Sequence, residues 1–253
     1  MTRIKKTDLV PPLLLHIYRD VRYGESYRDA SGINARKVQF TLPERSLMEL
    51  FPGIDAVHVT TPVSELYRPR DMVVPLPELL TLAAICRYTK PRRIFEIGTY
   101  TGSSTLEMAI NTSDETEILT LDLQPGEKIG SAFRDSAYTS KIRQLYGNSL
   151  EFDYTPYEHS VDLVLVDANH SYECVGSDTE KALSLLRPGG VIVWDDYRWL
   201  DELFECSGVT RFLNEFQAKR PPGSGDGAGS PSTGCASALT TSTPRLTRPP
   251  SSS

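Results

Sequence analysis

Apolar and polar positions alternate in blocks along the central part of the chain. Short apolar runs, typical of buried strands, end in Gly or Asp, and amphipathic segments typical of helices lie between them. Strands that alternate with helices predict a doubly wound α/β fold, a mostly parallel sheet with helices on both faces and a site at the carboxyl ends of its strands. The predicted strands are 93–97, 117–122, 141–146, 161–166 and 190–194, and the predicted helices are 76–88, 103–112, about 127–138, 173–186 and 200–217.

The two ends of the chain lack this alternation. Residues 1–71 predict an irregular cap region with short helical patterns at Leu13–Val21 and Glu44–Leu50, and residues 72–219 hold the α/β pattern. From Pro221 to Ser253, 24 of 33 residues are Pro, Gly, Ser or Thr. Such a segment buries too little apolar surface to offset its ordering entropy, so residues 220–253 are predicted to be disordered. With no strand after Lys219, the last strand is expected to have an open edge.

Composition narrows the class of protein. The chain has 253 residues and a net charge of −6, which argues against a nucleic-acid binder because such proteins present a basic face. Its four cysteines have no paired spacing and predict free thiols in a reducing compartment. No apolar run approaches the ~20 residues of a membrane span, and the N-terminus resembles a helix start more than a signal peptide. We therefore expect a cytoplasmic protein with no membrane or nucleic-acid partner.

A glycine loop follows the first predicted strand. The segment Glu96-Ile-Gly-Thr-Tyr-Thr-Gly-Ser-Ser104 joins a strand to a helix, and its glycines allow the backbone to approach a ligand closely. It lacks the G-x-G-x-x-G order of dinucleotide sites, since Tyr100 stands at the second glycine position, and the chain has no Gly-Lys-Ser/Thr of a Walker loop. The loop predicts a nucleotide-like ligand without a phosphate cradle. The alternative is a glycine-capped helix start of another α/β protein.

The Glu-x-Gly-x-x-x-Gly order resembles motif I of class I S-adenosylmethionine (SAM) dependent methyltransferases, which have a Rossmann-like fold. The resemblance implies that SAM is the cofactor. These enzymes usually end with a closing pair of antiparallel strands, and this chain is expected to lack that pair because no strand is predicted after Lys219. The cofactor-binding residues that the resemblance implies here are Glu96, Gly98, Thr99, Tyr100, Gly102, Ser103 and Ser104, with Glu96 placed to hold the ammonium or a bound water of the methionine part.

Residues after the next two strands complete this predicted binding site. Asp122 ends the second strand, twenty residues after Gly102, near the spacing at which an acid accepts hydrogen bonds from ribose hydroxyls. The alternative for Asp122 is a helix cap or an exposed strand end. Asn148 and Ser149 follow the third strand, where the resemblance implies contacts to adenine, although Gly-Asn is also an ordinary turn.

Acidic residues end the last two predicted strands. Asp167 follows one strand, and Asp195 and Asp196 follow its neighbour, so the three carboxylates are expected to converge. Because close carboxylates repel, they predict a divalent cation, Mg²⁺ first, with Mn²⁺ or Ca²⁺ as alternatives. The other interpretation of Asp195 and Asp196 is that they cap the following helix.

A second resemblance concerns Asp167-Ala-Asn-His170-Ser-Tyr-Glu together with Trp194-Asp-Asp-Tyr197. Over roughly residues 72–217 the chain resembles methyltransferases related to catechol and caffeoyl-CoA O-methyltransferases and to cephalosporin-hydroxylase-like proteins. The resemblance implies that the metal chelates substrate oxygens and that Asp167 takes part in catalysis. His170 stands where catechol-type enzymes carry a basic lysine, and an imidazole can accept a proton at neutral pH. His170 could instead be a helix-entry residue without chemistry.

These features predict metal-assisted methyl transfer from SAM to the hydroxyl of a small molecule. Two alternatives stay open: a SAM-binding or interaction protein with impaired catalysis, and an NAD-linked oxidoreductase, which Tyr100 disfavours. The expected partner is a small-molecule acceptor. The oligomeric state is open, with a homodimer as one candidate.

Overall fold

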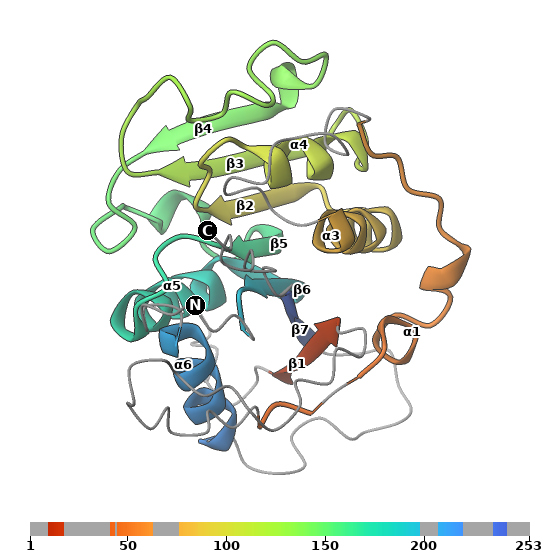
Figure 1. Ribbon diagram of the computed structural model, residues 1–253, viewed down its shortest axis with the longest axis vertical. Helices are drawn as coiled ribbons and strands as arrows, with labels where there is room; N and C mark the ends of the chain where they lie inside the picture. The colour runs from red at the N-terminus through yellow and green to blue at the C-terminus, as the bar shows by residue number, and fades with distance from the viewer. Residues whose placement is uncertain are drawn as a thin grey trace, which may run out of the picture.

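The computed structural model describes residues 10–17, 41–43, 45–62, 76–197, 207–219 and 235–241 (Figure 1). The strands are β1 (Val10–Ile17), β2 (Arg93–Ile97), β3 (Glu117–Asp122), β4 (Ile142–Tyr146), β5 (Val161–Val166), β6 (Leu186–Asp195) and β7 (Cys235–Thr241). The α-helices are α1 (Leu47–Leu50), α3 (Leu76–Thr89), α4 (Ser103–Ile110), α5 (Tyr172–Leu185) and α6 (Ser207–Ala218). Short 3₁₀ helices are η2 (Ile54–Ala56), η3 (Thr139–Lys141) and η4 (Thr155–Tyr157).

The strands form one sheet of seven in the order β1-β7-β6-β5-β2-β3-β4. Every neighbouring pair is parallel. The central β4-β3-β2-β5-β6 set reproduces the predicted strands, so the predicted α/β fold is confirmed. Because the strands are parallel, the loops after β2, β3, β4, β5 and β6 all reach the same edge of the sheet. An antiparallel closing pair is not found among the described strands.

The sequence predictions fail in both flanks of the sheet. A helical pattern was expected over Leu13–Val21, but Val10–Ile17 is strand β1, and the part of that range beyond residue 17 lies outside the described residues. No strand was expected after Lys219, but β7 pairs with the edge of β6 that the sequence left open. A short apolar run such as the one in β1 does not distinguish helix from strand by periodicity. The backbone N–H and C=O groups at the open edge of β6 can pair with β7, and the composition of the β7 segment does not reveal this pairing.

The helix predicted at about 127–138 is also wrong, because this segment consists of turns that end in η3. Gly130 has a φ of +70°, and its N–H donates to the carbonyl oxygen of Tyr100 at 2.7 Å. The Ala132 N–H donates to the carbonyl oxygen of Thr101 at 2.8 Å. Pairing with the glycine loop therefore replaces the bonds that a helix would make.

Helices cover both faces of the sheet, with α3 and α4 on one side and α5 and α6 on the other (Figure 1). Side chains of each strand alternate between the two sides. Thus Phe95, Val164 and Trp194 belong to the apolar cluster with α5 and α6. Their neighbours Ile94 and Val193 belong to the cluster with α3 and α4. This alternation decides where the acids at the strand ends point.

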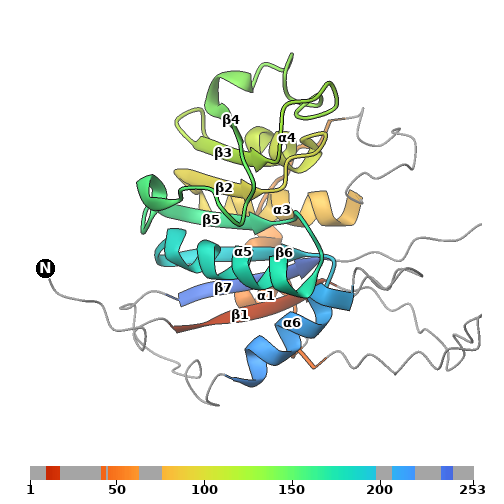
Figure 2. The same cartoon turned by 90° about the vertical axis from the view of Figure 1, so that its left-hand side faces the viewer.

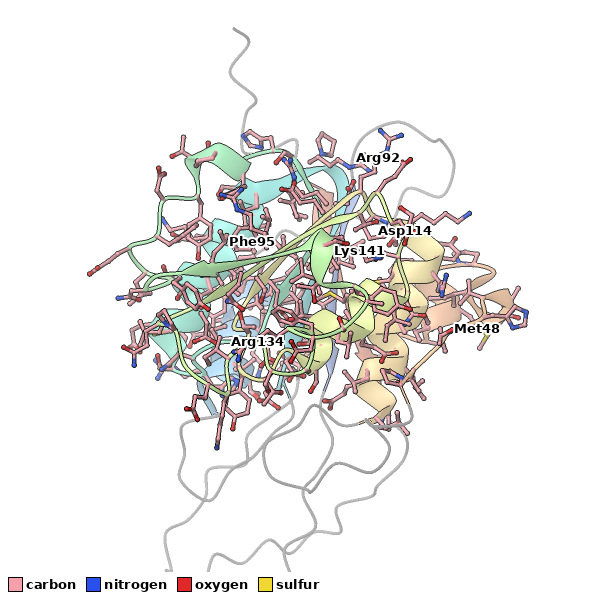
Figure 3. All side chains as sticks on the ribbon, turned by 90° about the horizontal axis from the view of Figure 1, so that it is seen from above. Met48, Arg92, Phe95, Asp114, Arg134 and Lys141 are labelled. Carbon is pink, nitrogen blue, oxygen red and sulfur yellow. The ribbon has the colours of Figure 1, made fainter. Side chains whose placement is uncertain are left out.

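The amino end of the sheet is held by polar contacts. Asp162, 8% exposed, accepts hydrogen bonds from the N–H groups of Arg92 and Arg93 at 2.8 Å and pairs with the Arg187 guanidinium. Lys141 donates through Nζ to the carbonyl oxygen of Ser113 at 2.9 Å, and it lies beside Asp114 when the molecule is seen from above (Figure 3).

Cys86 is buried and Cys174 is half-buried, and both are free thiols, as the cysteine spacing predicted. None of the helices in the described ranges is long and apolar enough to cross a bilayer.

Candidate functional site

The glycine loop turns sharply between β2 and α4. Gly98 has a φ of +105°, and a Cβ there would overlap the backbone carbonyl of Asp167, so the loop lies directly on the residue that ends β5. Tyr100 has a φ of +44°, so it adopts the left-handed conformation at the position where a dinucleotide loop has glycine. Gly102, with a φ of +78°, begins α4 beneath the ring of Phe133. The loop and the end of β5 therefore form one packed unit.

Asp122 lies at the end of β3 with its carboxylate turned toward this loop. Its Oδ2 accepts the N–H groups of Thr99 at 3.2 Å and Tyr100 at 2.8 Å, and its Oδ1 accepts the N–H of Leu123 at 2.7 Å. A carboxylate has about four acceptor positions, so these bonds leave about one for a further donor. Asp122 thus shapes the loop, and its predicted contact to ribose stays a prediction.

Glu96 is fully buried on the α4 side of β2. Its two oxygens accept hydrogen bonds from the hydroxyls of Ser104, Thr105 and Thr120, the last at 2.6 Å. Burial raises the pKa of the Glu96 carboxyl to about 7, although the three hydroxyls favour the charged form. The carboxyl therefore supports the start of α4 from within, and its predicted contact to the cofactor stays a prediction.

Two other predicted cofactor-binding residues, Thr99 and Ser103, also have side chains bonded within the protein. Thr99 Oγ1 bonds to Thr120 Oγ1 at 2.7 Å and accepts the amide of Gln144 at 2.9 Å. Ser103 Oγ lies 3.1 Å from Thr101 Oγ1. Their side chains connect the loop to the sheet, so its backbone is left as the surface that a ligand would meet.

The turn after β4 contains the two predicted adenine-contact residues. Asn148 Oδ1 accepts the N–H of Leu150 at 3.1 Å, which identifies Asn148 as a turn-forming residue. The Ser149 hydroxyl lies beside Asp178, a carboxyl that α5 buries completely. Burial raises the pKa of Asp178 to about 6, and the Ser149 hydroxyl partly offsets this effect. The turn lies at the correct edge of the sheet, and its contact to adenine stays a prediction.

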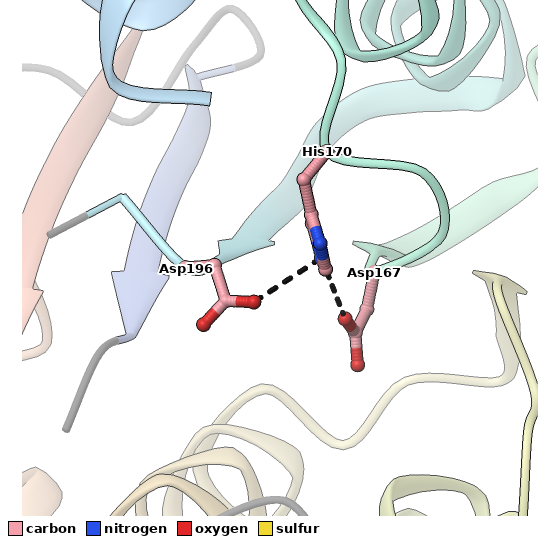
Figure 4. A group of neighbouring side chains, drawn as sticks. All are labelled: Asp167, His170 and Asp196. Atoms are coloured by element: carbon pink, nitrogen blue, oxygen red, sulfur yellow. Dashed lines mark ion pairs between the residues drawn. The ribbon is translucent and has the colours of Figure 1, made fainter. Parts of the chain in front are cut away.

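Two acids and a histidine converge where β5 and β6 end. The potential ligand atoms of Asp167, His170 and Asp196 all lie within 4.8 Å of one another. His170 Nε2 is 3.1 Å from Asp196 Oδ2 and 3.7 Å from Asp167 Oδ1 (Figure 4). The side chains of His170, Asp167 and Asp196 are 26%, 20% and 11% exposed, so the cluster is open enough to meet a ligand. We call these three residues the acid–histidine cluster.

Asp195 was expected in the same group, but the structure brings His170 into it instead. Strand alternation explains the difference, because Asp195 shares the α3 side of β6 with Val193. Asp196 follows the strand with a φ of +60°, which directs its carboxylate to His170. A non-glycine residue in the left-handed region is a strained conformation that is often found at functional sites. A ligand set of two carboxylates and an imidazole suits Mn²⁺, Fe²⁺ or Zn²⁺ better than it suits Mg²⁺, which prefers ligands that are all oxygen.

A small pocket borders the cluster on the α3 side of the sheet. Its walls include Glu78, Ser104, Asp167 and Asp195. Sequence reasoning missed Glu78, which is buried although it lies in an apolar helix. The signal in the sequence was that Glu78 is the one acidic residue of the mostly apolar helix α3. Asp167 therefore faces both the pocket and the cluster.

An all-parallel, doubly wound sheet with its glycine loop and acidic strand ends at one edge defines a Rossmann-like fold. In agreement, residues 95–197 match the family described as a methyltransferase domain. The matched range runs from within β2 to the turn that carries Asp196. The predicted resemblance to class I methyltransferases is confirmed over residues 95–197.

Two curated relatives are methyltransferases. Tapetum-specific methyltransferase 1 of Arabidopsis thaliana is 27% identical over 143 residues, which are 53% of this chain and 59% of that protein. O-methyltransferase hkm8 of Aspergillus hancockii is 33% identical over 144 residues, which are 52% of this chain and 56% of that protein. The chain thus spans less than two thirds of the length of each relative.

Among solved structures, the O-methyltransferase TomG of Streptomyces achromogenes, in complex with SAM, has a TM-score of 0.52 and 22% identity. The likeness covers 70% of this chain and 89% of that chain, which shows the shared fold.

Proposed function

We propose that this chain transfers a methyl group from SAM to a hydroxyl of a small molecule. The observation that carries the proposal is the packing of Gly98 on the carbonyl of Asp167. This contact places a loop suited to a nucleotide-like ligand against a cluster suited to bind and deprotonate a hydroxyl. The methyltransferase-domain match spans both parts, and an oxygen as acceptor agrees with the name of hkm8, an O-methyltransferase.

The donor would lie over the glycine loop. Its backbone can approach a ligand closely at Gly98 and Gly102, and no basic side chain stands in the loop to hold a phosphate. SAM carries a sulfonium in place of a pyrophosphate, so it suits such a loop. Its charged end would face the pocket walled by Asp167, Asp195 and Glu78, where carboxylates stabilise a positive charge.

The acceptor would lie at the acid–histidine cluster. During transfer, the oxygen of the acceptor forms a bond to the methyl carbon while the carbon–sulfur bond breaks, and S-adenosylhomocysteine leaves. The hydroxyl proton goes to Nε2 of His170. The carboxylates of Asp167 and Asp196 lie beside this nitrogen and stabilise the imidazolium that forms.

We also propose that the cluster binds a divalent cation, held by the carboxylates of Asp167 and Asp196. A cation bound there polarises the acceptor hydroxyl and lowers its pKa. His170 is close enough to join as a third ligand, so it serves either as ligand or as base. The main task of the other site residues is alignment, because holding oxygen and methyl in line supplies much of the rate.

The test is transfer from radiolabelled SAM to a panel of phenols, polyketides and sugars, with and without EDTA. We expect methylation of at least one hydroxyl compound and at least a 100-fold loss of turnover in His170→Gln. His159→Gln is the matched control, since His159 is exposed at the amino end of β5.

Binding of S-adenosylhomocysteine without transfer to any hydroxyl would favour the alternative of a non-catalytic SAM-binding protein. The cation is tested separately by Mn²⁺ titration with electron paramagnetic resonance. We expect Asp196→Asn to weaken Mn²⁺ binding, and equal binding in the variant and the parent would exclude the cation site.

A further inference from the structure

Helix α6 contacts both turns that carry the acid–histidine cluster. It lies beside α5 on the same face of the sheet (Figures 1 and 2). One turn, from Asp167 to Ser171, connects β5 to α5, and the other, Asp196 and Tyr197, follows β6. The position of α6 therefore affects the distance between His170 and Asp196.

The closest contact is at Gly208, in the first turn of α6. A Cβ at this position would overlap the carbonyl oxygen of His170 and lie 2.5 Å from the Tyr172 nitrogen and 2.7 Å from the Ser171 carbonyl carbon. These are backbone atoms, which cannot rotate away as a side chain can. Ordinary contact begins near 3.4 Å, so a larger residue would shift the helix or the turn by about 1 Å.

The same helix holds Tyr172, the first residue of α5 after the His170 turn. The Tyr172 hydroxyl donates to Glu215 Oε2 at 2.6 Å. The Tyr172 ring packs edge to face on Phe212 with ring centres 5.6 Å apart, and the Arg211 guanidinium lies 4.5 Å from the ring centre. The hydroxyl bond to Glu215 thus ties the first residue of α5, and with it the chain that leaves His170, to α6.

On the other side, α6 holds the turn of Asp196. The Thr210 hydroxyl donates to the carbonyl oxygen of Tyr197, and the Tyr197 hydroxyl donates to Asn214 Oδ1. The N–H of Leu42 in turn donates to the Tyr197 hydroxyl at 3.2 Å. Since Tyr197 is fully buried, these bonds act on a side chain with little freedom to rearrange. They fix the residue that directly follows the strained Asp196.

We propose that α6 is a positioning helix that sets the separation of His170 and Asp196, and that Gly208 determines how closely the helix approaches the His170 turn. The inference rests on the proposed function for its effect on turnover, but not for its effect on the geometry of the cluster. A displacement of about 1 Å can cost up to about 100-fold in rate without loss of binding.

The test compares Gly208→Ala with Gly176→Ala. Gly176 lies in α5, and a Cβ there would come within 3.0 Å only of the Phe212 ring, which can turn aside. Both variants change the α5–α6 interface, but only Gly208→Ala presses on the His170 turn. We expect kcat to fall about 10- to 100-fold in Gly208→Ala, with the Kd for S-adenosylhomocysteine unchanged, and to stay within about twofold in Gly176→Ala. An unchanged kcat in Gly208→Ala, or an equal loss in both variants, would overturn the proposal.

Histidine ring NMR separates this proposal from the proposed function. The chain has four histidines, so the His170 ring signal can be assigned with His170→Gln. We expect Gly208→Ala to move this signal at constant pH and Gly176→Ala to leave it in place, whether or not any acceptor is methylated. A parent protein that methylates nothing while the signal moves would refute the proposed function and leave the positioning role intact.

Tyr172→Phe is a second, milder variant that tests the proposal if Gly208→Ala does not fold. It removes only the hydroxyl bond to Glu215, and we expect a smaller movement of the same His170 signal. An unmoved signal in Tyr172→Phe would count against the proposal.

Discussion

Glu96 gives the domain a stability that depends on pH. Its carboxyl is fully buried, and burial raises its pKa from the ordinary 4.5 to about 7. When the folded-state pKa of an acid is raised, the unfolded state ionises first as the pH increases. The contribution of Glu96 to the free energy of unfolding is therefore largest below pH 4.5, falls between pH 4.5 and 7, and does not change further above that range. At about 1.4 kcal/mol per pKa unit, the total loss is about 3 kcal/mol.

The perturbation is Glu96→Gln, which removes the titration and keeps the shape of the side chain. The assay is urea unfolding from pH 5 to pH 8, followed by tryptophan fluorescence, to which Trp194, buried against α5, contributes. The parent is expected to lose about 2–3 kcal/mol more than the variant over this range. The difference between the two proteins matters here, because other groups titrate equally in both.

Glu151→Gln, at an exposed position, serves as the control and should follow the parent at every pH. Parallel curves for the parent and Glu96→Gln, with a constant difference, would show that Glu96 titrates as an ordinary carboxyl. The buried hydroxyl network would then favour the charged form as strongly as burial opposes it.

Two further substitutions test the supports of the sheet and of the loop. Asp162→Asn should lower the free energy of unfolding by about 2–3 kcal/mol, because the part-buried backbone N–H groups of Arg92 and Arg93 lose a carboxylate acceptor. Urea titration measures this loss, and unchanged S-adenosylhomocysteine affinity in the folded variant would confirm that it acts far from the site. Asp122→Asn should weaken that affinity about 10- to 100-fold by calorimetry, because Oδ2 accepts the N–H groups of Thr99 and Tyr100. Equal affinity in Asp122→Asn would exclude Asp122 from cofactor binding.

The central sheet could be predicted because each strand is a short apolar run with a clear end. β2, β3 and β5 have the residues that the pattern predicted. The segment 127–138 was mistaken for a helix because the spacing of its polar and apolar residues carries no information about backbone hydrogen bonds. Gly130 and Ala132 make such bonds to the glycine loop. Tertiary hydrogen bonds of this kind leave no periodic signal in the sequence.

The site was predicted in its location and only partly in its geometry. Parallel strands bring their ends together, which correctly placed Asp167 and Asp196 side by side. The sequence could not show that Asp195 and Asp196 diverge, since that depends on the face to which β6 turns each residue and on the φ of +60° at Asp196. Neither could it show that His170 closes the group, because a turn of three residues after β5 must fold back for its ring to reach Asp196.

The two halves of the proposed reaction are held by backbone contacts that tolerate only glycine. Gly98 fixes the donor loop against the carbonyl of Asp167, and Gly208 fixes α6 against the carbonyl of His170. Two residues lie between Asp167 and His170 along the chain, so one short turn is contacted at both of its ends. Backbone packing at both ends of this turn therefore limits how far Asp167 and His170 can move relative to the glycine loop and α6. Such a site is suited to a reaction whose rate depends on alignment.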